Sequence, residues 1–361
     1  MRWQTELPGR GVSSPVIVGG RVYITASSGA RDDRFHVLCF DTASGKQLWE
    51  RRFFATGNTI CHPKTCMAAP TPVASANRVF VLFASCDLFC LDKDGVLVWC
   101  RSLGQDYPDI TNHIGMASSP VLVGDILIVP IETPGESFAA GIDTATGRNR
   151  WKIDRTKENT WTTPFVWQRA AGAEVLLQSS DRLSSHDPKT GKQLWSLTGT
   201  ELAKIASPVA GSNLALTTTR EELLAVEPPV QAGGAARIVW RSTKLKPPTA
   251  TPLIHADKVY TITSVGLLCC ADVATGEIAW RERVPGRYSA SPVLAGDRLY
   301  LVNEDGVTTV VQLGIEPRVL ATNKLNEIVL GTPALADDAL FVRSDKHLFC
   351  ISTKKGTANP R

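Results

Sequence analysis

The sequence lacks several features that mark common functional classes. It has no run of 18 apolar residues, so no segment is long enough to cross a bilayer as a helix. No stretch shows the 3.6-residue periodicity of an amphipathic helix, which predicts a chain with almost no helix. The net charge is only +4, so no strong attraction to nucleic acid or to an anionic membrane is expected. The Gly-x-Ser-x-Gly, phosphate-loop and zincin motifs are also missing.

The start of the chain lacks the pattern of a secretory leader. Met1 is followed directly by the strand-like RWQTEL, rather than by a basic and then an apolar segment. We therefore expect either that a leader is missing from this sequence or that the protein stays inside the cell. Hydrophobic residues make up 43% of the chain, which is typical of a soluble protein with a substantial core.

What the sequence does contain is a repeat. A Ser-Pro or Thr-Pro dipeptide followed by apolar residues occurs eight times, at intervals of 40 to 57 residues. An Asp-x-x-(x)-Gly-x-x-x-Trp element follows most of these dipeptides, as in DTASGKQLW and DVATGEIAW. The prolines are Pro15, Pro72, Pro120, Pro164, Pro208, Pro252, Pro292 and Pro333. Repeats of about this length that contain four short strands each are typical of propeller blades.

Each repeat has the pattern of four antiparallel strands. In the first, PVIV, RVYITA, HVLCFD and KQLWERRF are rich in β-branched and aromatic residues, and Gly, Asp and Ser turns separate them. The eighth repeat has three such strands but no fourth strand with a tryptophan. The strand RWQTEL at the other end of the chain has Trp3. We predict one all-β domain over residues 1–361, an eight-bladed propeller in which the Trp3 strand pairs with His347 to Ser352 and closes the ring.

These repeats resemble those of the pyrroloquinoline-quinone (PQQ) propeller family, and the resemblance covers essentially the whole chain. It implies that each outer-strand tryptophan docks onto the neighbouring blade near the glycine of the motif, as a structural contact. These tryptophans are Trp3, Trp49, Trp99, Trp151, Trp195, Trp240 and Trp280. One branch of the family, the quinoprotein alcohol dehydrogenases, holds PQQ and a calcium or lanthanide ion over the axis. The BamB-like branch is non-catalytic, so function has to be argued from a site.

Two features could indicate a quinoprotein, but the repeats favour structural roles for both. Adjacent cysteines contact the cofactor in those dehydrogenases, and Cys269 and Cys270 are adjacent here. Small residues occupy the position of Cys270 in other repeats, and neighbours on a strand point to opposite faces, so we expect packing roles and no disulfide. Trp161 is a weak candidate for stacking against a cofactor near the axis. Other residue types at its position in other repeats favour a neutral lining role, and we expect no cofactor.

Most of the extra sequence belongs to one face of the predicted ring. Because strand direction alternates, the b–c turns and the connections between blades share a face. Long segments there are 29–34, 55–69, 104–117 and 132–137, whereas 228–236 and a smaller insertion near Gly314 belong to the other face. Long loops on a rigid scaffold often carry recognition, so we predict partner binding over blades one to three. The candidate residues are Arg31, Asp32, Arg34, His62, Lys64, Tyr107, Asp109, His113, Glu132 and Glu136.

Two cysteines in the first long connection leave three alternatives open. Cys61 and Cys66 could form a disulfide that pins the loop, remain free thiols, or join His62 and His113 in a metal site. Cys-x4-Cys is not a standard zinc spacing, so a metal is the weakest of the three. The total of nine cysteines is odd and does not decide the compartment.

Three functions are therefore compatible with the sequence. The favoured one is a non-enzymatic, BamB-like scaffold, a monomer that binds a protein or peptide, binds no nucleic acid and has no transmembrane segment. The alternatives are a quinoprotein oxidoreductase that depends on PQQ and calcium, and a ligand- or metal-binding sensor domain of a larger protein. Related sequences are mostly exported, so we expect the periplasm or the cell envelope.

Overall fold

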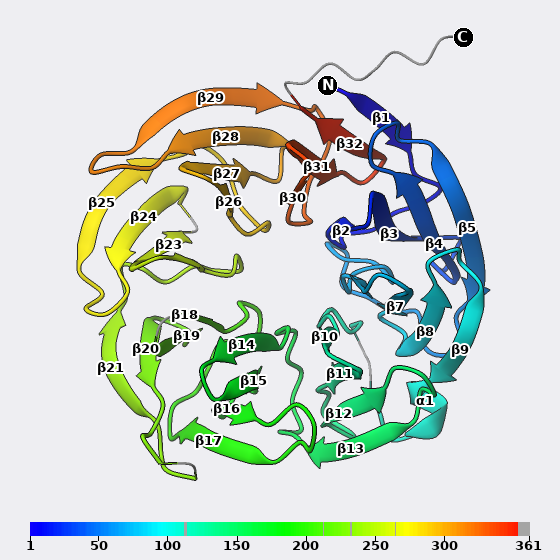
Figure 1. The fold of residues 1–361 in the computed structure, drawn as a ribbon, viewed down its shortest axis with the longest axis horizontal. Coiled ribbons are helices and arrows are strands. Elements are labelled where there is room, and N and C mark those ends of the chain that lie inside the picture. Colours follow the sequence, from blue (N-terminus) through cyan, green and yellow to red (C-terminus); the bar gives the residue numbers. More distant parts are fainter. Residues whose placement is uncertain (112–113, 212, 232, 264, 353–361) are drawn as a thin grey trace.

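Eight four-stranded antiparallel sheets are arranged as a ring around a central axis (Figure 1). The structure is a computed structural model that describes residues 1–111, 114–211, 213–231, 233–263 and 265–352. Each sheet is one blade, so the predicted all-β, eight-bladed propeller is confirmed. Among the described residues the one helix is the short α1 (Leu103–Asp106). No helix in the described part of the chain is long and apolar enough to span a membrane.

The strands follow the chain in order, four to a blade. Blades one and two contain β2 (Val16–Val18), β3 (Arg21–Ser28), β4 (Arg34–Asp41), β5 (Gln47–Phe54), β6 (Val73–Ala74), β7 (Arg78–Leu82), β8 (Asp87–Asp92) and β9 (Leu97–Ser102). Blades three and four contain β10 (Val121–Val123), β11 (Ile126–Ile131), β12 (Phe138–Asp143), β13 (Asn149–Asp154), β14 (Phe165–Arg169), β15 (Gly172–Gln178), β16 (Arg182–His186) and β17 (Gln193–Thr198).

The second half repeats the arrangement and ends with the composite blade. Blades five and six contain β18 (Val209–Gly211), β19 (Leu214–Thr218), β20 (Leu223–Glu227), β21 (Arg237–Ser242), β22 (Leu253–His255), β23 (Lys258–Ile262), β24 (Leu267–Asp272) and β25 (Ile278–Arg283). Blades seven and eight contain β26 (Val293–Ala295), β27 (Arg298–Val302), β28 (Val307–Gln312), β29 (Arg318–Lys324), β30 (Ala334–Ala336), β31 (Ala339–Arg343), β32 (His347–Ile351) and β1 (Trp3–Glu6).

Strand β1 closes the ring. It pairs antiparallel with β32, and Trp3 lies opposite Cys350 while Glu6 lies opposite His347. Figure 1 shows the blue first strand beside the red last blade. The predicted pairing of the two ends is confirmed, and through it the last sheet obtains its fourth strand.

In seven of the eight blades a small residue on the third strand makes room for the tryptophan of the fourth, and blade seven has no tryptophan on that strand. In blade three Gly141 is the cross-strand partner of Trp151, and a side-chain carbon added to Gly141 would lie 2.2 Å from the indole. The indole of Trp151 therefore covers Gly141. The corresponding pairs are Cys39 with Trp49, Cys90 with Trp99, Ser185 with Trp195, Ala225 with Trp240, Cys270 with Trp280 and Cys350 with Trp3.

Five of these indoles also contact the next blade. The Trp151 Nε1–H donates to the carbonyl of Pro188 at 2.9 Å, and Gly191 has a φ of 72° beneath the ring. Trp3, Trp49, Trp99 and Trp240 donate in the same way to carbonyls of the next blade. The Trp195 Nε1–H instead donates to Glu174 of its own blade, and the facing turn of blade five carries the insertion 228–236, in which Ala235 forms an isolated bridge with Ser196.

The adjacent cysteines of blade six belong to two different cores. Cys269 packs with Leu216 and Val259 between blades five and six, whereas Cys270 packs with Ile262 and Leu299 between blades six and seven. Both thiols are free. Regular strand geometry sends consecutive side chains to opposite faces of β24, which accounts for the separation.

Candidate functional site: the loop-rich face and the axial pocket

The connections between blades surround a pocket on the propeller axis. Its volume is about 320 Å³, and each of the eight connections contributes at least one lining residue. Because residues from all eight connections surround it, the pocket lies on the axis. The lining residues are Val12, His62, Lys64, Thr65, Ile114, Gly115, Ala117, Trp161, Ile205, Thr249, Ser289 and Leu330.

Trp161 forms part of the wall of this pocket. Its Nε1–H donates to the carbonyl of Gly115 at 3.0 Å, and its backbone N–H donates to the carbonyl of Lys204 at 2.8 Å. These two bonds tie the connection before β14 to its neighbours on both sides. The position that we considered for a stacking platform therefore lies at the axis, with its indole half-buried and its polar atom already paired.

Segment 62–65, called the strap below, lies at the edge of the axial pocket and contributes three of its lining residues. The Lys64 ammonium forms an ion pair with Glu304 of blade seven, with an Nζ–Oε1 distance of 2.6 Å. The Arg10 guanidinium donates to the Pro63 carbonyl at 2.8 Å, and the His62 backbone N–H donates to the Ile114 carbonyl at 3.1 Å. The strap is therefore held at both sides, by blade seven and by the two neighbouring connections.

The second long connection packs against the b–c turn of blade three. The Glu136 backbone N–H donates to the Asp109 carbonyl at 2.8 Å, and the Gly135 N–H donates to the Thr111 hydroxyl at 2.8 Å. A side chain at Gly135 would collide with that carbonyl of Asp109. The predicted candidates of the two segments therefore belong to one packed unit.

The structure places the partner-face candidates in different environments. Arg31, Arg34, His62, Lys64 and Asp109 are exposed, and Asp32 is half-buried with a φ of 53°. Tyr107 is half-buried because it packs on Phe138 and accepts a hydrogen bond from Asn149, and Glu136 pairs with Lys152 at 2.7 Å. His113 lies outside the described residues.

Glu132 is not on the surface, which corrects its prediction as a partner-face residue. It is 5% exposed, and its Oε1 accepts from the Arg155 Nε–H at 3.0 Å and from the Ser179 hydroxyl at 2.8 Å. Burial raises the pKa of the Glu132 carboxyl, and Arg155 opposes the shift. Insertion length alone predicted an exposed turn, but this carboxylate points inward toward a buried cation.

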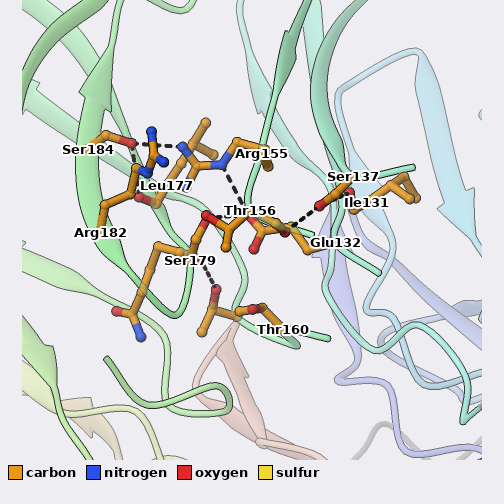
Figure 2. Close-up of polar contacts among 12 residues, drawn as sticks. Ile131, Glu132, Ser137, Arg155, Thr156, Thr160, Leu177, Ser179, Arg182 and Ser184 are labelled. Atoms are coloured by element: carbon orange, nitrogen blue, oxygen red, sulfur yellow. Dashed lines mark hydrogen bonds and ion pairs between the residues drawn. The ribbon is translucent and has the colours of Figure 1, made fainter. Parts of the chain in front are cut away.

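The pair extends into a chain of buried polar groups between blades three and four. Figure 2 shows Arg155 between Glu132 and Ser184, and the Arg155 Nη1–H donates to the Ser184 hydroxyl at 2.9 Å. Ser184 lies 3.0 Å from His186 Nε2, and the His186 Nδ1–H donates to the Gly191 carbonyl. Burial lowers the pKa of His186 to about 4, so its ring is neutral at pH 7.

The two cysteines that flank the strap, Cys61 and Cys66, are free thiols. Cys61 is half-buried and Cys66 is fully buried, and burial raises the pKa of both. The disulfide alternative therefore does not describe this structure. Within the described ranges no three His, Cys, Asp or Glu side chains are grouped as a metal site would require. His113, the fourth residue of that hypothesis, is among the residues not described.

Comparison with known proteins adds to this geometry. Residues 1–152 and 229–317 match the family model described as "Outer membrane protein assembly factor BamB". The chain belongs to this family. A BamB protein of Shewanella oneidensis is 22% identical over 335 residues, covering 91% of this chain and 71% of that protein.

Solved structures of BamB and of dehydrogenases share the fold. BamB from Moraxella catarrhalis aligns with a TM-score of 0.68 and 16% identity, covering 98% of both chains. A europium-containing methanol dehydrogenase aligns with a TM-score of 0.75 and 13% identity over 94% of this chain and 83% of its own. At these identities the likeness establishes the architecture alone, so membership of the BamB family and the side chains have to support any proposal.

The described residues of the axial pocket do not fit a calcium-dependent cofactor. Calcium in proteins takes six to eight oxygen ligands, usually including carboxylates. The lining residues that the structure describes provide hydroxyls, an imidazole and an ammonium but no carboxylate. A Lys64 ammonium in the lining adds a positive charge where a cation would have to bind. We therefore derive no oxidation step for this member of the BamB family.

Proposed function

We propose that this BamB-family propeller is a non-enzymatic scaffold of the bacterial cell envelope that binds a protein partner over the loop-rich face of blades one to three. Family membership supports a role of this class, since the matching model describes an assembly factor. The observation that carries the proposal is the construction of the face itself. Long connections there are tied to one another by backbone hydrogen bonds, so they form a preformed surface.

The composition of this face suits protein recognition. Phe54 and Ile60 expose 69% and 60% of their surface at the start of the first long connection. Exposed charged residues of both signs, Arg31, Arg34 and Asp109, lie on neighbouring loops of the same face. Apolar side chains with a charged surround are the composition expected of a partner-binding surface.

Site-specific photo-crosslinking tests which face is used. A photoreactive amino acid replaces Ile60 on the loop-rich face or, as a matched control, Val96, which is 56% exposed in the β8–β9 turn on the opposite face. We expect a discrete protein adduct from position 60 in envelope extracts, and its yield should fall in the Arg34→Glu background. Adducts of equal yield from both positions, or none from position 60, would contradict the proposal.

Thermal denaturation separates the scaffold from the oxidoreductase alternative. A ligand that binds only the native state must raise Tm. We expect no shift when PQQ and calcium are added together, and no quinone absorbance in the purified protein. A concentration-dependent rise in Tm with dye-linked alcohol oxidation would replace the scaffold by an enzyme.

A further inference from the structure

The axial pocket has apolar walls and a polar rim with few kinds of functional group. Its described apolar lining comes from Val12, Ile114, Ala117, Trp161, Ile205 and Leu330. At about 320 Å³ it is at the lower end of the range for ligand pockets, roughly 300 to 1,000 Å³. This space suits one or two residues of an extended segment and excludes a helix or a folded element.

The hydroxyl groups of the rim have already used their hydrogens. The Thr65 hydroxyl donates to the His62 carbonyl at 3.0 Å, the Thr249 hydroxyl to the Tyr288 carbonyl at 3.1 Å, and the Ser289 hydroxyl to Glu304 at 2.8 Å. These groups therefore offer few donors to an incoming molecule.

The strap supplies the donors. The Lys64 backbone N–H donates to His62 Nδ1 at 3.1 Å, so a neutral His62 ring carries its proton on Nε2 and donates from that atom. The Lys64 ammonium has three N–H groups, and it contacts one oxygen of the Glu304 carboxylate. It can therefore still donate to a further acceptor. The described lining contains two groups that donate and no carboxylate, which selects for an anionic acceptor.

We propose that the axial pocket anchors the C-terminal residue of the partner, with an apolar side chain against Trp161 and the free α-carboxylate at Lys64 and His62. This assignment rests on the proposed scaffold function. A chain end is favoured over an internal segment because the eight connections surround the pocket, so an internal segment would have to enter and leave through the same opening on this face. Capture of a C-terminal carboxylate by a small set of donors is an established mode of peptide recognition.

Electrostatics also favours a carboxylate at this point. Glu304 pairs with Lys64 in the free protein, and Lys64 is the more exposed partner, with 47% of its side chain accessible against 22%. An incoming carboxylate can share or replace that contact, and Glu304 keeps the hydrogen bond from Ser289. After the exchange Glu304 also keeps the attraction of the nearby Arg287, so its charge is not left isolated.

Fluorescence polarisation with short peptides tests the anchor directly. The probes are labelled hexapeptides Gly-Ser-Gly-Ser-Ala-X with X as Phe, Leu, Ile or Val, each as a free acid and as a C-terminal amide. At least one free acid should bind at least ten-fold more tightly than its amide. Lys64→Gln should abolish this ratio, Lys64→Arg should keep most of it, and Trp161→Ala should weaken the acid and the amide alike. The control Lys258→Gln, at the start of β23 on the opposite face, should bind as the wild type does.

The outcomes separate the anchor from the scaffold function. Free acids that bind no better than amides, or no binding by any of the four acids, would overturn the anchor. If the adduct at position 60 then persists in Lys64→Gln, the loop-rich face still binds a partner and only the axial anchor fails. If the adduct itself is missing, the scaffold proposal falls. A Tm measurement for every variant shows that it remains folded.

Discussion

Arg155 is a residue whose loss should destabilise the fold strongly. It is 8% exposed, and it alone provides a cation within 4.0 Å of the buried Glu132 among the described residues. Removing one partner of a buried pair leaves an uncompensated charge, and the penalty is about 3–5 kcal/mol. We expect Arg155→Met to lower the free energy of unfolding by about that amount, measured by urea denaturation.

A matched surface pair provides the comparison for this prediction. Arg237 and Glu227 are 69% and 40% exposed, and exposed pairs contribute about 0–1 kcal/mol. Arg237→Met should therefore have little effect. The double variant Glu132→Leu/Arg155→Met should recover part of the stability that Arg155→Met loses, and an equal loss in the single and the double variant would contradict the charge argument.

His186 should make stability depend on pH. Its pKa is lowered from 6.5 to about 4 because the ring is buried, so the unfolded chain binds the proton at a higher pH than the folded one. Stability from this residue is complete above about pH 6.5 and is lost as the pH falls toward 4, by about 3 kcal/mol in total. His186→Gln should flatten this part of the curve of unfolding free energy against pH.

Single residues were predicted unevenly from the sequence, for physical reasons. The small-residue position of Cys270 could be found because the repeat displays it several times, once for each tryptophan that covers it. Glu132 could not be placed, because its partner Arg155 lies 23 residues away and the repeat contains no second example of the pair. His186 gave no signal at all, since its environment depends on the packing of blade four.

The turn between the third and fourth strands is the element that joins neighbouring blades. Gly191 has a φ of 72°, and a side-chain carbon there would lie 2.7 Å from the Trp151 ring of the preceding blade. Gly191→Ala combines backbone strain with a collision, so it should cost more than 1 kcal/mol. Gly314→Ala, in the corresponding turn of blade seven where nothing lies closer than 3.4 Å, is the control and should be nearly neutral in the same denaturation assay.

The elements themselves were the most predictable level. Alternating β-branched residues and Gly or Asp turns mark the strands locally, so their existence follows from short windows of sequence. For the long connections, only the lengths could be predicted from the sequence. Their packing, including the ion pair between Lys64 and Glu304, joins residues that are 240 positions apart, and no local pattern encodes such a contact.

At the scale of the whole molecule, closure depends on six residues at the start of the chain. Deleting residues 1–6 removes β1, leaves one edge of β32 unpaired and uncovers Phe341 and Cys350, which pack with Trp3. We expect a lower Tm and concentration-dependent oligomers, because an open edge pairs with other chains. Light scattering and thermal denaturation measure both effects.

A synthetic peptide provides the decisive control. Adding residues 1–9 in trans should restore Tm and suppress the oligomers, and the same peptide with Trp3→Ala should do so less well, because it lacks the indole that donates to Thr42 of blade one. Full stability of the truncated chain without the peptide would show that ring closure contributes little.

The ring could be predicted as a whole because its repeats are counted along the sequence and its two ends complement each other. The axial pocket could not, since it is formed by eight connections that come together only once the ring has closed. The position of Trp161 in the repeat predicted that it lies near the axis. The residues that surround it there could not be predicted, because they come together only in the assembled molecule.

The pairing of β1 with β32 has a consequence for synthesis. Strand β1 is synthesised before every other described strand of the ring, and its partner β32 is synthesised after them. The other seven sheets can form in order while β1 remains unpaired. A ribosome that stops before β32 thus releases an arc in which β1 is unpaired, and the fold itself distinguishes a closed ring from an open one.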